Sequence, residues 1–132
     1  MEVMKIAAAY FEAWNQHDSG KIVAAFSVGG TYLDPSSGGA LVGEAVGHYA
    51  SGLFAAFPNL TFEVVTAGAI GENMVAAQWV MRGTNTGSML GGPPTGKTVA
   101  LHGADFITME GGKIRSVRGY FDMKELGEQL GF

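Results

Sequence analysis

The chain has 132 residues, of which 47% are apolar and 15% charged, a composition that fits one globular domain with a single core and excludes a disordered chain. The net charge of −4, without any basic block, argues against nucleic acid and anionic membranes as partners. The absence of cysteine excludes disulfides, thiolate metal sites and cysteine catalysis.

The sequence also lacks the marks of membrane insertion and secretion. No stretch approaches the apolar length of a membrane span, and the N-terminus has no basic start followed by an apolar core. We therefore expect a cytoplasmic protein that forms one domain over residues 1–132.

The first predicted element is a helix over residues 3–14. Its apolar side chains recur at steps of three and four, which places Tyr10 and Trp14 in one wide buried stripe. A buried tyrosine hydroxyl usually has a partner, so Tyr10 is either a core residue bonded to a backbone carbonyl or a functional donor. A second short helix is predicted over residues 21–26, ending near Gly29 and Gly30.

Asp34 lies where a short predicted strand over residues 31–34 meets Pro35 and a flexible Ser-Ser-Gly-Gly segment. It is either a turn-forming aspartate before proline or a functional carboxylate with some access to solvent. Residues 42–57 then resume helical spacing, with Phe54 among the aromatic side chains, and Pro58 ends this helix.

The second half of the chain reads as hairpin-connected strands. Strands are predicted over residues 60–70, 74–83, 98–109 and 114–121, followed by a helix over residues 122–130 capped by Asp122. The glycine- and proline-rich residues 84–96 suit a lid or a partner contact. This order of elements predicts an α+β fold, a cone-shaped curved antiparallel sheet with N-terminal helices packed over it, enclosing an apolar pocket.

Asp105 stands out within the strand over residues 98–109. Alternation places it on one face with five uncharged residues, Val99, Leu101, Gly103, Ile107 and Met109. A lone carboxylate on such a face either lies at an open sheet end, pairs with a basic residue such as Arg82 or Arg118, or belongs to a functional site.

Four short strings occur in the second half of the chain, Gly83-Thr-Asn-Thr-Gly87, Gly92-Pro-Pro-Thr-Gly-Lys97, Gly112-Lys-Ile-Arg115 and Gln129-Leu-Gly131. With the order of elements, they resemble the SnoaL-like polyketide cyclases of the nuclear-transport-factor-2-like superfamily, over essentially the whole chain. The resemblance implies the cone fold and a cyclase reaction. In those cyclases a catalytic aspartate occupies the position of Gly119, and a histidine that of Asp105. A glycine cannot transfer a proton, so this cyclase pattern is incomplete.

The chain is also similar to bacterial ketosteroid isomerases, where a tyrosine and a protonated aspartate bind an oxyanion and a second aspartate before a proline moves the proton. The matching residues are Tyr10 in Ala-Ala-Tyr-Phe-Glu-Ala, Asp34 in Tyr-Leu-Asp-Pro and Asp105 in Gly-Ala-Asp-Phe. Tyr10 and Asp34 are 24 positions apart (34 − 10), as in the isomerase pattern. The resemblance implies that Tyr10 and Asp105 are neutral donors and that Asp34 is the ionised base.

The remaining candidates define the pocket and the expected partners. Neither a metal nor a nucleotide cofactor is expected, because His17, His48 and His102 lack ligand spacing and no phosphate loop opens a helix. We expect a hydrophobic small-molecule ligand, and a homodimer through the outer sheet face with Ala100 and Phe106. The predicted pocket wall comprises Trp14, Phe54, Trp79, Leu101, Gly103, Val117 and Gly119.

Three functions remain open on the sequence alone. The first is a cofactor-free isomerase that moves a proton next to a carbonyl, using Tyr10, Asp34 and Asp105. The second is a cyclase that uses Asp105 differently. The third is a small-ligand binding module without turnover.

Overall fold

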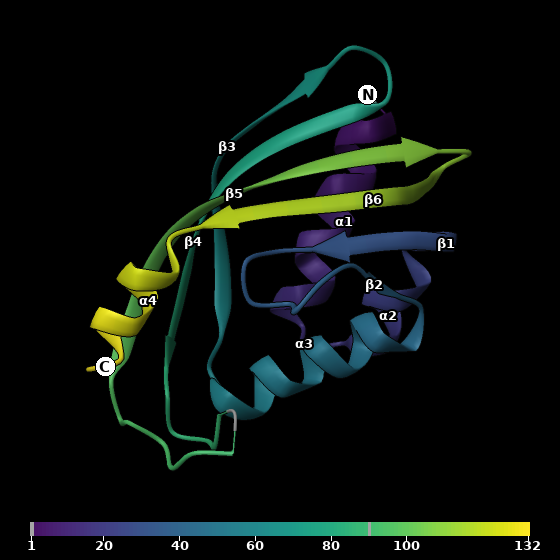
Figure 1. The fold of residues 1–132 in the computed structure, drawn as a ribbon. Helices are drawn as coiled ribbons and strands as arrows, with labels where there is room; N and C mark the ends of the chain where they lie inside the picture. Colours follow the sequence, from purple (N-terminus) through teal and green to yellow (C-terminus); the bar gives the residue numbers. More distant parts are fainter. Residues whose placement is uncertain (1, 90) are drawn as a thin grey trace.

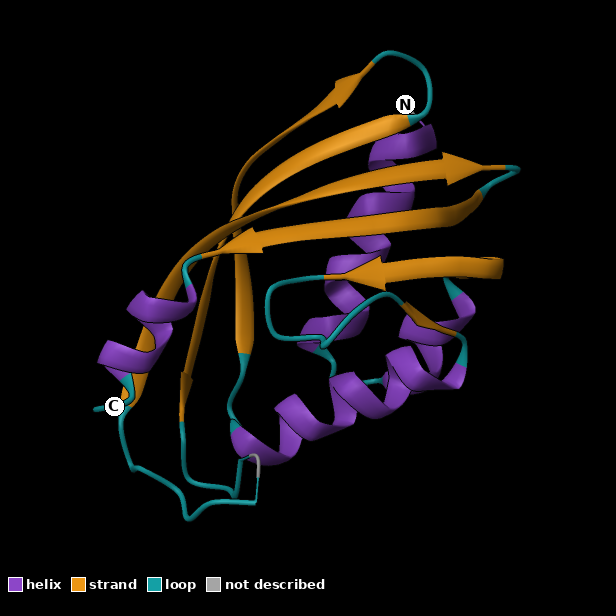
Figure 2. Ribbon diagram, viewed as in Figure 1, coloured by secondary structure: helices purple, strands orange, loops and turns teal. Residues whose placement is uncertain are grey.

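The predicted α+β architecture is confirmed in a computed structural model of the protein, which describes residues 2–89 and 91–132. Helices lie against one side of a strongly curved, open sheet (Figures 1 and 2). The sheet has six strands in the order β2-β1-β6-β5-β4-β3. In chain order the elements are α1 (Glu2–Asn15), α2 (Ser19–Ala24), β1 (Phe26–Leu33), β2 (Leu41–Val42), α3 (Glu44–Ala56), β3 (Thr61–Ile70), β4 (Met74–Thr84), β5 (Thr98–Glu110), β6 (Lys113–Phe121) and α4 (Met123–Gln129).

The helices close the concave side of the sheet. α1 packs against β3 and β4, α2 against α1 and α3, and α4 against β5. The stripe predicted for α1 is buried, with Tyr10, Phe11 and Trp14 in the core. α4 begins where expected, because the Asp122 side chain accepts hydrogen bonds from the backbone N–H groups of Lys124 and Glu125.

The prediction for the second helix is wrong at its C-terminal end, which comes two residues earlier than expected. α2 starts one residue after its cap Asp18 and stops at Ala24, and Phe26 already belongs to β1. Phe26 pairs with Ile114 of β6, so contact with a distant strand overrides the local helical pattern. The glycines expected to end a helix lie inside β1. A β-carbon on Gly30 would approach the Ile114 carbonyl oxygen at 2.8 Å, which explains a glycine at this close approach.

Strand pairing brings the predicted site residues together. β1 runs parallel to β6, with Leu33 opposite Arg118, while the other neighbouring strands are antiparallel. Asp105 of β5 lies opposite Gly119 of β6. The end of β1, the middle of β6 and the middle of β5 therefore meet, and Asp34 follows β1 at this point.

The segment between β4 and β5 is anchored to the end of α3. Asn85 is fully buried, and its side-chain amide donates to the carbonyls of Ala56 and Gly87. The Asn85 side-chain oxygen accepts from the backbone N–H and hydroxyl of Thr95. A single residue thus ties both arms of this segment to the helix.

None of the helices in residues 2–89 and 91–132 is long and apolar enough to cross a bilayer.

Candidate active site

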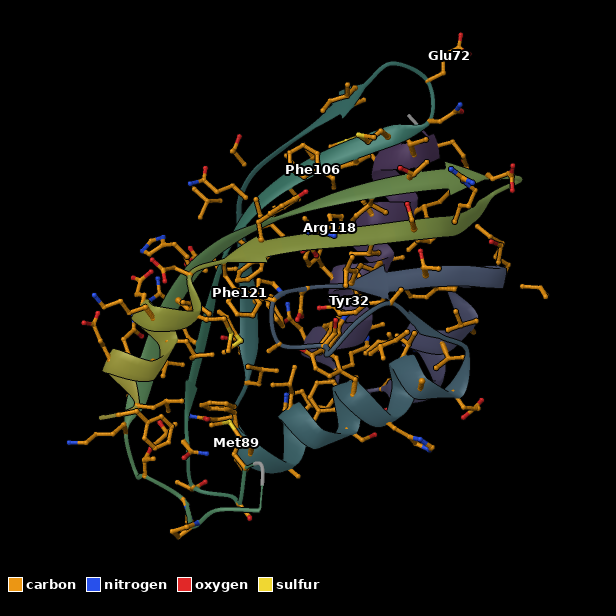
Figure 3. The ribbon with its side chains drawn as sticks, viewed as in Figure 1. Tyr32, Glu72, Met89, Phe106, Arg118 and Phe121 are labelled. Atoms are coloured by element: carbon orange, nitrogen blue, oxygen red, sulfur yellow. The ribbon has the colours of Figure 1, made fainter. Side chains whose placement is uncertain are left out.

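A cavity of about 700 Å³ lies between the helices and the concave face of the sheet. Most of its wall is apolar or aromatic, and Figure 3 shows three contributors from different segments, Tyr32, Met89 and Phe121. The polar side chains gather where β1, β6 and β5 meet. Tyr10, Asp34 and Asp105, the three residues predicted to carry the chemistry, all line this one cavity.

Asp105 is buried, with 6% of its surface exposed, and it has no basic partner among the described residues. Arg82 pairs instead with Glu63 at 3.1 Å, and the Arg118 guanidinium lies over the Tyr120 ring. Burial raises the pKa of the Asp105 carboxyl from its ordinary value of 3.8 to about 7, the Trp79 indole N–H opposes this increase, and the negative charge of Asp34 adds to it. Both the protonated and the ionised carboxyl are therefore populated near neutral pH.

Tyr10 is almost completely buried, and its hydroxyl has no hydrogen-bond partner among the described residues. The expected alternative, a core tyrosine bonded to a backbone carbonyl, is therefore wrong. Edge contacts with the rings of Phe11, Trp14 and Phe26 hold the phenol. Burial raises the pKa of Tyr10 and the nearby Asp105 charge raises it further, so the group is a neutral donor. The Trp14 indole is near enough to oppose this increase, but it does not meet the distance and angle of a hydrogen bond to the hydroxyl.

Asp34 is more buried than its place beside a flexible loop predicted, with 7% of its surface exposed. Its Oδ2 accepts from the hydroxyls of Tyr32 at 2.5 Å and Tyr49 at 2.7 Å. Its Oδ1 accepts from the Ser36 backbone N–H at 2.7 Å, the Ser36 hydroxyl at 3.1 Å and Tyr49 at 3.0 Å. A set made only of donors matches an ionised carboxylate, which can only accept.

Sequence reasoning missed Tyr32, Tyr49 and Ser36. Tyr32 precedes Asp34 by two positions at a strand end, so alternation could have placed the two side chains on one face. Tyr49 comes from α3, and its contact with Asp34 depends on how α3 docks beside β1. No local pattern encodes that docking.

Gly119 lies in close contact with both aspartates. A β-carbon at this position would lie 3.0 Å from Asp105 Oδ1 and 3.2 Å from the β-carbon of Asp34. The absence of a side chain therefore allows Asp105 and Asp34 to pack against the same point of the β6 backbone, although their carboxyls have unlike surroundings: among the described residues Asp105 has no basic partner, and Asp34 accepts from several donors.

The predicted pocket wall divides into two groups. Trp14, Trp79, Leu101 and Gly119 line the cavity, but Phe54, Gly103 and Val117 lie outside its wall. Phe54 stacks on the His17 ring with centroids 4.3 Å apart, and Val117 is buried in the sheet core. Gly103 lies under the Trp79 ring, where a β-carbon would come within 2.3 Å of the indole.

Trp79 places a second unpaired donor in the site. Its Nε1 is buried and has no hydrogen-bond partner in the described part of the chain, although it is close enough to Asp105 to lower that carboxyl's pKa. We treat the contact as a weak polar interaction, because a hydrogen bond requires both a short distance and a favourable angle.

The three histidines lie apart from one another. His17 Nε2 is 2.8 Å from the Leu60 carbonyl oxygen, His48 lines the cavity from α3, and His102 is exposed on β5. Within residues 2–89 and 91–132, no three histidine, aspartate or glutamate side chains come close enough together to hold a metal ion.

The chain matches one protein family and is similar to several solved structures. The family model described as SnoaL-like polyketide cyclase matches residues 4–130. Among curated proteins, none matches the chain significantly. Solved structures with the same fold include a candidate hydroxylase, AclR from Streptomyces galilaeus, with 25% identity, a TM-score of 0.85, and coverage of 98% of this chain and 81% of that one.

Two further structures extend this comparison. SalBIII, an epoxide hydrolase/cyclase-like enzyme with a role in pyran ring formation in the polyether salinomycin, is 26% identical, with a TM-score of 0.79 and coverage of 95% of this chain and 97% of that one. A candidate polyketide cyclase from Xanthomonas campestris pv. campestris is 22% identical, with a TM-score of 0.88 and coverage of 98% and 97%. At that identity the second likeness concerns the fold alone.

Proposed function

The chain belongs to the SnoaL-like polyketide cyclase family, and from this premise we propose that it is a cofactor-free enzyme that moves a proton on a carbon next to a carbonyl of a hydrophobic substrate. The fold alone hosts several reactions, so the proposal rests on the side chains that line the cavity.

One observation carries the proposal. The Tyr10 hydroxyl is a buried donor without a hydrogen-bond partner in residues 2–89 and 91–132, and it lies on the same cavity as Asp105, whose pKa of about 7 keeps a large protonated fraction at neutral pH. An unpaired buried donor has a free-energy cost that a bound acceptor relieves. Two neutral donors in a dry site are suited to an oxygen that gains negative charge during a reaction.

Asp34 supplies the base in this mechanism. Its carboxylate takes a proton from the carbon next to the substrate carbonyl, the C–H electrons move into a dienolate, and the carbonyl oxygen gains charge beside Tyr10 and protonated Asp105. Asp34 then returns the proton to a more distant carbon of the dienolate, which moves the double bond into conjugation. Both aspartates line the one cavity in which this exchange would occur.

A cyclisation is the second candidate, favoured by the family match. Its first step is the same proton removal, after which the enolate carbon attacks a second carbonyl of the same molecule and that carbonyl oxygen takes up the proton. The choice between the two outcomes then depends on whether the substrate folds a second carbonyl towards the enolate. Gly119 stands where the resembling cyclases carry an acid, which weighs against their established mechanism in this chain.

The apolar wall supports a hydrophobic substrate with its carbonyl at the polar end. Aromatic side chains such as Trp14, Phe62 and Trp79 surround the cavity, and they favour flat ring systems over flexible polar chains.

The test is conversion of a β,γ-unsaturated cyclic ketone to its conjugated isomer, followed by absorbance at pH 7, with Asp34→Asn as the control. Saturable conversion by the wild type that the control loses supports the isomerase. Conversion of a diketone to a ring-closed product, with none of the unsaturated ketone, would assign the cyclase. Saturable binding of both compounds without turnover would leave a binding module and refute the proposal.

A further inference from the structure

Hydrogen-bond donors surround both oxygens of the Asp34 carboxylate. Four donor groups make five contacts of 2.5 to 3.1 Å with the two oxygens. Oδ2 accepts from two hydroxyls, those of Tyr32 and Tyr49, which fill its two lone-pair sites when both donate. Oδ2 can therefore take up a proton only when one of these two hydroxyls turns away, and the structure points to which of the two can do so.

Tyr49 is the donor with an alternative acceptor. Its hydroxyl oxygen lies 2.6 Å from Ser36 Oγ as well as 2.7 Å from Asp34 Oδ2, and Ser36 Oγ lies 3.1 Å from Asp34 Oδ1. These three groups form a closed triangle with two hydroxyl hydrogens. In one arrangement Ser36 donates to Tyr49, and Tyr49 donates to Asp34 Oδ2. In the other Tyr49 donates to Ser36, Ser36 donates to Oδ1, and Oδ2 loses one of its two donors.

Tyr32 provides the internal contrast. It donates to the same oxygen, Asp34 Oδ2, at 2.5 Å, but it is buried, and among the described residues its hydroxyl has no other hydrogen-bond partner. Ser36, by contrast, is exposed to solvent. Of the two hydroxyls that donate to Oδ2, Tyr49 is therefore the one that contacts a solvent-exposed group among the described residues, and Ser36 itself also touches Oδ1.

We propose that Tyr49 is a switchable donor that frees Oδ2 of Asp34 for the substrate proton and, with Ser36, forms a relay between this proton and solvent. The inference rests on the proposed function for Asp34. Once Asp34 is protonated, its proton passes to the Tyr49 oxygen, the Tyr49 proton passes to Ser36, and the Ser36 proton passes to water. Each hydroxyl keeps one hydrogen, Asp34 returns to a carboxylate, and the reverse sequence delivers a solvent proton.

The relay predicts a result that a purely structural role of Tyr49 beside Asp34 does not. A proton held by Asp34 can exchange with solvent before it returns to the substrate, so the product formed in heavy water should contain deuterium at the new C–H position. Tyr49→Phe should reduce the ratio of solvent deuterium to transferred hydrogen by about tenfold or more, since it removes a positioned proton-transfer group. Tyr32→Phe removes a donor to the same oxygen but should keep the wild-type ratio.

Serine variants supply a second matched pair. Ser36→Ala breaks the link to solvent and should lower the ratio as Tyr49→Phe does. Ser37→Ala alters the same loop, because Ser37 contacts the backbone of Asp34 and Gly39, but it leaves the triangle intact and should keep the wild-type ratio. Equal ratios for the two tyrosine variants, or for the two serine variants, would overturn the relay.

A measurement without substrate separates this inference from the proposed function. Proton magnetisation transfer from water should reach the Tyr49 hydroxyl faster than the Tyr32 hydroxyl, and Ser36→Ala should slow Tyr49 to the rate of Tyr32. A Tyr49 signal too broad to observe in the wild type counts as fast exchange and should appear in Ser36→Ala. Similar slow exchange at both tyrosines in the wild type refutes the relay, whereas failure of every ketone to react refutes the enzymatic proposal alone.

Discussion

Replacing Asp105 by asparagine should remove a loss of stability that the wild type undergoes as pH rises. Burial raises the carboxyl pKa from 3.8 to about 7 in the folded protein, so between these values the unfolded chain ionises while the folded one stays protonated. The unfolded state then binds fewer protons, and the free energy of unfolding falls as pH rises. At about 1.4 kcal/mol for each pKa unit, the full effect is about 4 kcal/mol.

An asparagine at this position has nearly the same shape and does not ionise. The free energy of unfolding of Asp105→Asn minus that of the wild type should therefore increase with pH, by about 2 to 3 kcal/mol between pH 5 and 8, and level off above the folded pKa. Urea denaturation of both proteins at each pH measures this difference. The contributions of the other titrating groups largely cancel in it, because both proteins contain them. A difference independent of pH, or one that falls as pH rises, would refute the argument that burial of an unpaired carboxyl dominates.

Three further predictions concern other parts of the molecule. Tyr10→Phe should lower kcat about 100-fold without lowering the urea midpoint, because the hydroxyl has no hydrogen-bond partner in the described part of the protein; a clear loss of stability would show that the hydroxyl is bonded in the folded protein. Gly87→Ala should cost about 3 kcal/mol or more, since its β-carbon would lie 1.8 Å from the Ala55 carbonyl oxygen, whereas Gly52→Ala in α3 meets no atom within 4 Å and should gain about 0.5 kcal/mol; equal thermal midpoints would contradict this. A homodimer through the outer sheet face should become monomeric in Phe106→Glu by light scattering, and a wild type that is monomeric at high concentration would remove this expectation.

The sheet was predictable from sequence because its signals are local. The strands β5 and β6 largely alternate buried and exposed positions, and glycine-containing turns join β3 to β4 and β5 to β6, so the type and limits of β3 to β6 followed within a residue or two. The burial of Asp105 also followed from alternation, since Leu101, Asp105 and Ile107 share the inner face.

The parts that failed depend on distant contacts. β1 was assigned partly to a helix, because its pairing with β6 involves residues far apart in the chain. The surroundings of Asp34 were missed for the same reason, since Tyr49 reaches it from α3. Phe54 was expected in the pocket, but stacking on His17 holds it outside the wall. Single-residue patterns indicate that a side chain is buried, but which group it then meets depends on packing.

The two aspartates have opposite protonation states in the proposed mechanism, and the relative turnover of Asp34→Asn and Asp105→Asn tests this most directly. An amide cannot accept and return a proton, so Asp34→Asn should lose about 100-fold or more in kcat at pH 7. An amide can still donate a hydrogen bond, so Asp105→Asn should stay within about tenfold of the wild type. Equal losses, or a greater loss for Asp105→Asn, would contradict the assignment of Asp34 as base and Asp105 as donor.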